Sequence, residues 1–140
     1  MKDKKVKVGS NVNNIFVGVD IESILRFKDL DRNRSERFLS KIFTKNEIDY
    51  CFSKRYPAQH LAARFAGKEA LIKAIKSTKI KTVNLQLNNV EITNNVNGSP
   101  SVSINNYKLI NKNNILNMKF KISLSHSEDM AIAFALLILQ

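Results

Sequence analysis

Apolar and polar positions divide the chain into a first half with mainly helical spacing and a second half with mainly strand spacing. Residues 15–19 form an apolar run that predicts a buried strand, and Asp20 stands where this strand is expected to give way to a helix reaching Phe27. Asp20 would then cap the start of that helix with its carboxylate. Thr44 and Glu47 have the spacing of a capping box, which predicts the start of another short helix.

The longest predicted helix begins at Pro57, a residue suited to the first helical turn, and ends near Lys76. Alanines recur every four residues along it and form a smooth stripe that allows close packing against a neighbouring element. The stripe consists of Ala62, Ala66, Ala70 and Ala74.

Strand signals dominate the sequence after this helix. Strands are predicted at residues 83–87, 90–93, 102–104, 120–124 and 131–139, the last of them as a central strand. Turns are expected at residues 97–100 and 125–129. Because the helices precede most of the strands, we expect an α+β fold with an antiparallel sheet packed on the long alanine-rich helix.

Length and composition fit one globular domain. The chain has 140 residues, of which 44% are hydrophobic and 25% charged. We expect a flexible basic arm at residues 1–14 and a single domain at residues 15–140. The lone Cys51 excludes an internal disulfide, and the apolar run 130–139 is too short to span a membrane. The lysine-rich start lacks the apolar stretch of a secretory signal, so a cytoplasmic location is expected, with a plastid stroma after loss of a targeting segment as the alternative.

The chain is strongly basic, with 23 Lys and Arg against 12 Asp and Glu and a formal net charge of +11. Such an excess attracts nucleic acid, anionic lipid, a phosphorylated small molecule or an acidic protein, and composition does not choose among them. Enrichment in Asn and Lys also accompanies AT-rich genomes, which offers a partner-free explanation for part of this charge.

Glu69 is the only carboxylate between Asp49 and Glu91, and many lysines and arginines surround it. One interpretation is an ion pair with Lys73 one turn later, worth about 0.3–0.5 kcal/mol. The other is that Glu69 and a second carboxylate, Asp20, hold a magnesium ion beside an anionic ligand that Lys73 also touches. The residues alone leave both interpretations open.

Three further features bear on the chemistry. His126 lies in a polar turn, where it is either an exposed turn residue or a phosphate-binding or acid–base group. Cys51 lies between Tyr50 and Phe52, which favours a packing role over nucleophilic catalysis. Neither a P-loop nor a dinucleotide-binding glycine motif occurs in the sequence.

The order and spacing of several segments resembles the holo-acyl-carrier-protein synthases, the small phosphopantetheinyl transferases, from about Ile15 to the C-terminus. The RFAGKEA segment at residues 64–70 is specific for the family when it occurs together with the GVD and SLSHS segments, whereas any one of them alone is a weak signal. The others are GVD at residues 18–20, Lys73 with Ala74, NGSP at residues 97–100 and SLSHS at residues 123–127.

This resemblance implies a reaction and an assembly. Such enzymes transfer the 4′-phosphopantetheine group of coenzyme A to a serine of apo acyl carrier protein, release adenosine 3′,5′-bisphosphate and need Mg²⁺. They are typically homotrimers with active sites at the subunit interfaces. Neither nucleic acid nor membrane is then an expected partner, and the two anionic partners are a phosphorylated cofactor and an acidic carrier.

The resemblance also implies the site residues. Asp20 and Glu69 correspond to the metal ligands, and Glu69 and Lys73 to the catalytic residues. Docking of the carrier falls on Arg26, which Arg34 and Arg37 can join. The residues expected to bind the cofactor are Arg64, Lys68, Lys73, Ser125 and His126.

The chain departs from the family pattern in two places. A glutamate usually follows the metal-binding aspartate by three residues, but that position is Ser23 here, and Glu22 stands one place earlier. The loop after the long helix is usually glycine-rich, whereas residues 76–79 contain no glycine. A basic nucleic-acid-binding α+β module is the competing function, and a trimeric scaffold without catalysis is a third.

Overall fold

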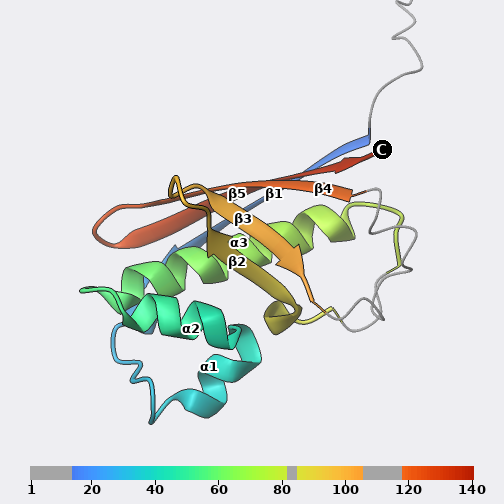
Figure 1. The fold of residues 1–140 in the computed structure, drawn as a ribbon. Helices are drawn as coiled ribbons and strands as arrows, with labels where there is room; N and C mark the ends of the chain where they lie inside the picture. The colour runs from blue at the N-terminus through green and yellow to red at the C-terminus, as the bar shows by residue number, and fades with distance from the viewer. Residues whose placement is uncertain (1–13, 82–84, 106–117) are drawn as a thin grey trace, which may run out of the picture.

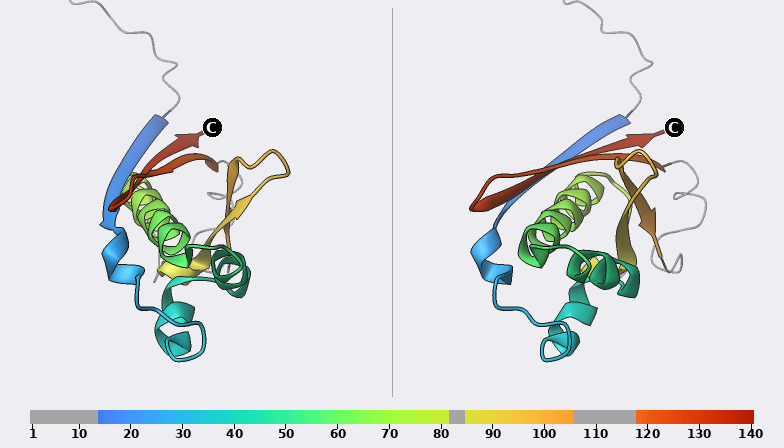
Figure 2. Two further views of the ribbon diagram at one scale, coloured as in Figure 1. Left: turned by 90° about the vertical axis from the view of Figure 1, so that its left-hand side faces the viewer. Right: turned by 60° about the vertical axis from the view of Figure 1, so that its left-hand side comes forward.

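The computed structural model describes residues 14–81, 85–105 and 118–140. The expected arm at residues 1–14 lies outside these ranges except for Asn14, which begins the first strand. Figures 1 and 2 show a sheet on one side, a long central helix beneath it, and two short helices on the opposite side of that helix. No helix within the described ranges is long and apolar enough to cross a membrane.

The main sheet joins the two ends of the chain. Strand β1 (Asn14–Ser23) and strand β4 (Met118–His126) both pair antiparallel with strand β5 (Met130–Leu139), which is therefore central as predicted. The register places Asn14 opposite Leu139, so the start of β1 lies beside the C-terminus (Figure 1). A separate antiparallel hairpin consists of β2 (Val90–Asn94) and β3 (Pro100–Ile104).

Helix α3 (Pro57–Lys76) has the predicted bounds and carries the core. All four alanines of its stripe are fully buried. They face the inner side of the sheet, where Ala131, Ala133 and Ala135 are also fully buried. Small residues on both surfaces let the backbones approach closely: a Cβ at Gly18 of β1 would collide with the carbonyl oxygen of Ala70. The fold is therefore α+β with an antiparallel sheet on the alanine-rich helix, as expected.

The outer side of β1 and β5 remains exposed and apolar. Alternation along β1 points four β-branched side chains outward, each 54–58% exposed, and β5 adds Met130, Ile132 and Phe134. These seven residues form what we call the outer apolar face. Its β1 members are Ile15, Val17, Val19 and Ile21. One helix on a small sheet thus covers only the inner side.

Smaller elements surround the N-terminal half of α3. The 3₁₀ helix η1 (Ile24–Phe27) follows β1, and helices α1 (Glu36–Ile42) and α2 (Lys45–Phe52) follow in turn. The predicted capping box is confirmed, because the Thr44 hydroxyl accepts from the Glu47 amide and the Glu47 carboxylate accepts from the Thr44 amide. Gly98 has a positive φ of 83° in the expected turn between β2 and β3.

Three local predictions are wrong. The first strand runs past Asp20 to Ser23, so Asp20 caps no helix and pairs across the sheet with Ala133. Residues 82–84 lie outside the described ranges, and the rest of the strand predicted at residues 83–87 leads instead into the 3₁₀ helix η2 (Leu87–Asn89). His126 ends β4 and does not lie in the turn, because its backbone pairs with Ala131.

Candidate functional site

Strand alternation and helix periodicity bring four charged side chains to one side of the molecule. Asp20 and Glu22 are two residues apart on β1 and share the face towards α3, while Glu69 and Lys73 are one turn apart on α3. We call these four residues the open cluster. It contains both metal ligands and both catalytic residues that the sequence analysis predicts.

Lys73 ties the two elements of the open cluster together. Its Nζ lies 2.6 Å from Asp20 Oδ1 and donates to the carbonyl oxygen of Val19 at 3.0 Å. The Asp20 hydrogen bond raises the pKa of Lys73, and the charges of Asp20, Glu69 and Glu22 act in the same direction. Among the ion pairs of the described residues Lys73 is thus paired with Asp20, and the alternative of a Glu69–Lys73 pair is not observed.

One oxygen of Asp20 fits a metal ligand. Asp20 Oδ2 is buried and has no hydrogen-bond partner within the described residues, while Oδ1 binds Lys73. A buried carboxylate oxygen without a donor is unfavourable unless a cation or water satisfies it. Magnesium typically binds to one or two carboxylates and completes its shell with water and substrate phosphates. The described residues contain no group of three or more potential metal ligands.

Glu22 is engaged by a different cation, and this links the open cluster to Arg26. Glu22 Oε2 forms an ion pair with Arg26 Nη1, in which the Glu22 side chain is 12% and the Arg26 side chain 57% exposed. Burial raises the pKa of Glu22, and the charge of Arg26 opposes this effect. The Arg26 guanidinium also lies over the ring of Phe65, 5.3 Å from its centroid. The sequence analysis noted Glu22 only as a departure from the family pattern.

A basic hollow adjoins Glu69. It has a volume of about 520 Å³, and the lysines Lys41 and Lys76 line it together with Glu69. The remaining lining residues are Ile72, Leu85, Gln86 and Leu87. Sequence reasoning missed Lys41, since the charged stretch before Thr44 gave no helix prediction. The positive charges of Lys41 and Lys76 suit an anionic ligand in this hollow.

Two of the residues expected to bind the cofactor are buried. Lys68 is fully buried, and its Nζ lies 2.6 Å from Glu47 Oε2, whose side chain is also fully buried. Arg64 is 3% exposed and donates to the Ile92 carbonyl oxygen at 3.2 Å and to Asn94 Oδ1 at 2.7 Å. Both cations therefore contact protein groups and not the hollow beside Glu69.

The remaining expected residues lie apart from the open cluster. Ser125 and His126 are exposed at the end of β4. His126 and Glu22 both stand opposite Ala131, so the width of β5 separates them, roughly 9–10 Å at the usual strand spacing. Arg34 and Arg37 are exposed near Phe38, which is 47% exposed, and these three residues line a shallow hollow with Lys41. Arg34, Arg37 and Lys41 thus form a basic surface around one exposed aromatic side chain.

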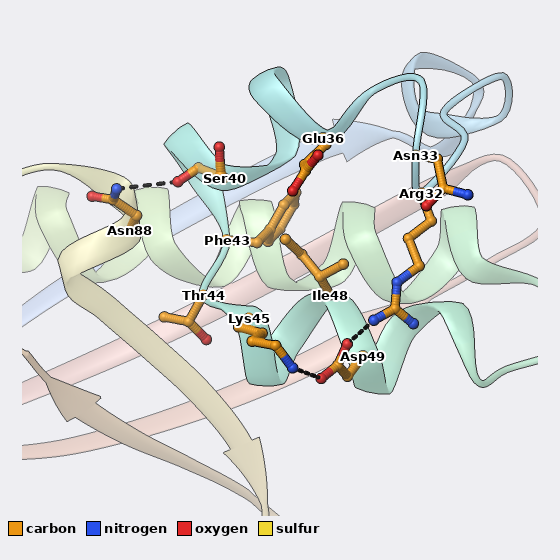
Figure 3. A pocket seen from close by; sticks show the side chains of 10 residues that line it. All are labelled: Arg32, Asn33, Glu36, Ser40, Phe43, Thr44, Lys45, Ile48, Asp49 and Asn88. Carbon is orange, nitrogen blue, oxygen red and sulfur yellow. Dashed lines mark hydrogen bonds and ion pairs between the residues drawn. The ribbon is translucent and has the colours of Figure 1, made fainter.

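A second hollow, of about 480 Å³, lies between α1, α2 and the loop before them (Figure 3). Asp49 receives Lys45 Nζ at 3.0 Å and also pairs with Arg32, and the Lys45 hydrogen bond lowers the pKa of Asp49. At its edge, Asn88 Nδ2 donates to the Ser40 carbonyl oxygen at 3.2 Å. This hollow shares no residue with the open cluster.

Comparisons with known proteins identify relatives that match most of the chain. A holo-[acyl-carrier-protein] synthase of Thermodesulfovibrio yellowstonii is 45% identical over 121 residues, which cover 86% of this chain and 96% of the relative. A protein of the same name from Protochlamydia amoebophila is 40% identical over 119 residues, 85% of this chain and 93% of the relative.

Solved structures show the same fold. The Chronobacterium ammoniagenes ACPS–CoA complex has a TM-score of 0.73 at 26% identity and covers 91% of this chain and 98% of its own. The acyl carrier protein synthase of Mycobacterium tuberculosis has a TM-score of 0.68 at 28% identity, covering 91% and 100%. The model of the 4′-phosphopantetheinyl transferase superfamily matches residues 16–135. This chain is therefore a member of the 4′-phosphopantetheinyl transferase superfamily.

Proposed function

We propose that the protein transfers the 4′-phosphopantetheine group from coenzyme A to a serine of apo acyl carrier protein in a Mg²⁺-dependent reaction. The observation that carries the proposal is the open cluster: an aspartate with a buried unpartnered oxygen, a lysine bound to it, and a glutamate one turn away beside a basic hollow. The relatives that carry the name holo-[acyl-carrier-protein] synthase and the CoA complex of a structural neighbour support it.

The chemistry requires neutralisation of phosphate charge. The serine oxygen bonds to the β-phosphorus of coenzyme A, and the bond from that phosphorus to the oxygen of the adenosine 3′,5′-bisphosphate leaving group breaks. Asp20 and Glu69 would hold Mg²⁺, which when bound neutralises charge on the pyrophosphate. Lys73, 53% exposed, stabilises the leaving bisphosphate. Glu69 accepts the proton that the serine loses.

Lys41 and Lys76 extend this site. Both lysines line the hollow with Glu69 and supply cationic groups for a multiply phosphorylated cofactor. Lys68 does not belong to this set, because its ammonium is buried against Glu47. The hollow thereby supplies positive charge beside residues 76–79, a loop that is usually glycine-rich in the family and contains no glycine here.

The carrier would dock on Arg26, Arg34 and Arg37. All three arginines are exposed, Arg34 and Arg37 beside Phe38, and a small acidic protein complements such a surface. The Glu22 ion pair and the Phe65 ring hold Arg26 beside the open cluster, so a carrier bound there brings its serine close to Glu69 and Lys73.

We further propose a homotrimer with shared active sites. The outer apolar face exposes seven large hydrophobic side chains of β1 and β5, and such patches mark interaction surfaces. His126 and Ser125 lie apart from Asp20 within one chain, which suits a site completed by a neighbouring chain. A mixture of Asp20→Ala and His126→Ala proteins should then regain activity that neither variant has alone. Full activity of a dilute monomer would contradict the shared site.

The proposed reaction is tested with apo acyl carrier protein and coenzyme A, with and without Mg²⁺. Mass spectrometry should show the carrier gaining the phosphopantetheine group only when enzyme and metal are both present. Unmodified carrier under all conditions would contradict the function. Binding of duplex or single-stranded nucleic acid in place of transfer would favour the competing basic module.

A further inference from the structure

A group of buried hydrogen bonds centred on Lys68 joins the elements around the hollow beside Glu69. The Lys68 ammonium donates to the carbonyl oxygens of Ile42 at 2.7 Å and Leu87 at 3.1 Å, and it pairs with Glu47 Oε2 at 2.6 Å. An ammonium has three donors, so these acceptors use all of them. Lys68 is fully buried and adjoins Glu69 in the sequence, yet it has no donor left for a ligand.

Glu47 extends the connections of Lys68 to two more elements. Glu47 Oε2 also accepts from the Thr44 amide at 2.8 Å, and Oε1 accepts from the Ile92 amide at 2.9 Å. A single buried ion pair therefore connects α1, α2, η2, β2 and α3. Buried charges are tolerated only when paired and hydrogen-bonded in this way.

Two of these connections join elements that line the hollow. Ile42 follows Lys41, which lines the hollow from α1, and Leu87 lines it from η2. Nearer the surface, Asn88 donates to the Ser40 carbonyl oxygen and joins the same two elements (Figure 3). We call Ser40, Ile42, Leu87 and Asn88 the α1–η2 seam. Lys68 closes the inner half of the seam, and Asn88 closes the outer half.

We propose that Lys68 is a positioning residue: by closing the α1–η2 seam it fixes the shape of the hollow beside Glu69 and so sets the affinity for the cofactor without touching it. That the cofactor is a multiply phosphorylated one, coenzyme A, rests on the proposed function. A purely structural role would stabilise the whole fold and leave the shape of the hollow unchanged.

The decisive variant is Lys68→Met combined with Glu47→Gln, which removes both charges and leaves no unpaired carboxylate in the core. The matched control is Leu137→Ala, which destabilises the buried side of β5 away from the seam. Two quantities are measured for each protein: amide hydrogen exchange in the ligand-free state, and the KM values for coenzyme A and for the carrier.

In the double variant, exchange at residues 40–43 and 86–89 should accelerate about tenfold more than exchange in β5. The KM for coenzyme A should rise about fivefold or more, whereas the KM for the carrier stays within about twofold. The control should show neither selective effect. Uniform acceleration across the fold, or equal shifts of both KM values, would overturn the positioning role.

Exchange in the ligand-free protein separates this proposal from the function itself. Absence of transfer by the unmodified protein would overturn the proposed function alone, because the exchange pattern still reports on the seam. If the double variant does not fold, Asn88→Ala opens only the outer half of the seam. That variant should accelerate exchange at the same residues by a smaller factor, and unchanged exchange there would overturn the proposal.

Discussion

Lys68 and Lys73 occupy the same helix and each lies 2.6 Å from a carboxylate, yet their surroundings are opposite. The Lys68 and Glu47 side chains are fully buried, whereas Lys73 is 53% and Asp20 13% exposed. Burial lowers the pKa of Lys68, with the charge of Glu47 opposing this, and the Asp20 hydrogen bond raises the pKa of Lys73. Two ion pairs of equal length therefore differ in what surrounds them: one connects elements of the core, and the other leaves its lysine half exposed.

The largest expected difference between the two lysines is in stability. Lys68→Met leaves the Glu47 charge buried without a partner, so the free energy of unfolding should fall by about 3–5 kcal/mol. Lys73→Met removes a pair whose lysine is half exposed and whose aspartate water can still reach in part, so the loss should be smaller, about 1 kcal/mol. Urea unfolding followed by circular dichroism measures both values. Similar losses for the two variants would contradict the contrast in burial.

In catalysis we expect the larger effect at Lys73, the lysine with the smaller effect on stability. Lys73→Met removes the cation proposed to stabilise the leaving bisphosphate, and kcat should fall about 100-fold, the effect typical of losing one donor that stabilises transition-state charge. Circular dichroism should show an intact fold. If kcat stays within about threefold of the unmodified value, Lys73 only neutralises Asp20.

Arg26 tests whether the open cluster is also the place where the carrier arrives. Arg26→Glu reverses an exposed charge, and the KM for the carrier should rise about tenfold, equivalent to 1.4 kcal/mol. The KM for coenzyme A should stay nearly constant, and added salt should weaken the carrier interaction of the unmodified protein. Lys45→Glu makes the same change on α2 and serves as the control. Equal effects on both substrates would show that Arg26 is not selective for the carrier.

The smallest effect on activity is expected from modification of Cys51, which lies in the hydrophobic core. Its side chain is fully buried, and burial raises the pKa of its thiol to about 12. The thiolate needed for attack on a thiol reagent is therefore scarce at neutral pH. Incubation with iodoacetamide should leave the folded protein unmodified and fully active. Rapid alkylation with loss of transfer would contradict the buried position of Cys51.

Several elements of the fold could be predicted because their signals are local. The four-residue alanine repeat, Pro57 and the Thr44–Glu47 capping box each specify their helix within a few residues, and the structure confirms them. The extent of β1 could not be predicted in this way. Its last residues continue as a strand because β5, from the other end of the sequence, pairs with them as far as Ser23.

The candidate site, too, could be predicted only in part from the sequence. The resemblance to the family predicted Asp20, Glu69 and Lys73, which the fold brings to one side. It also predicted Lys68, within the RFAGKEA segment, as a cofactor-binding residue. Only the packing of α1, η2 and β2 around α3 buries Lys68. Lys41 was missed because its place in the hollow depends on that same packing.

The most direct test of the proposed function is the Mg²⁺ dependence of transfer in the unmodified protein and in a Glu69 variant. Transfer to apo carrier is followed by mass spectrometry across a Mg²⁺ titration for the unmodified protein and for Glu69→Gln, which keeps the shape and removes the charge. The account predicts no transfer without Mg²⁺, and a rate for the variant lower by about tenfold or more at limiting Mg²⁺, with an intact fold. If the variant transfers as fast as the unmodified protein at limiting Mg²⁺, Glu69 holds no metal ion, which would contradict the proposed magnesium site.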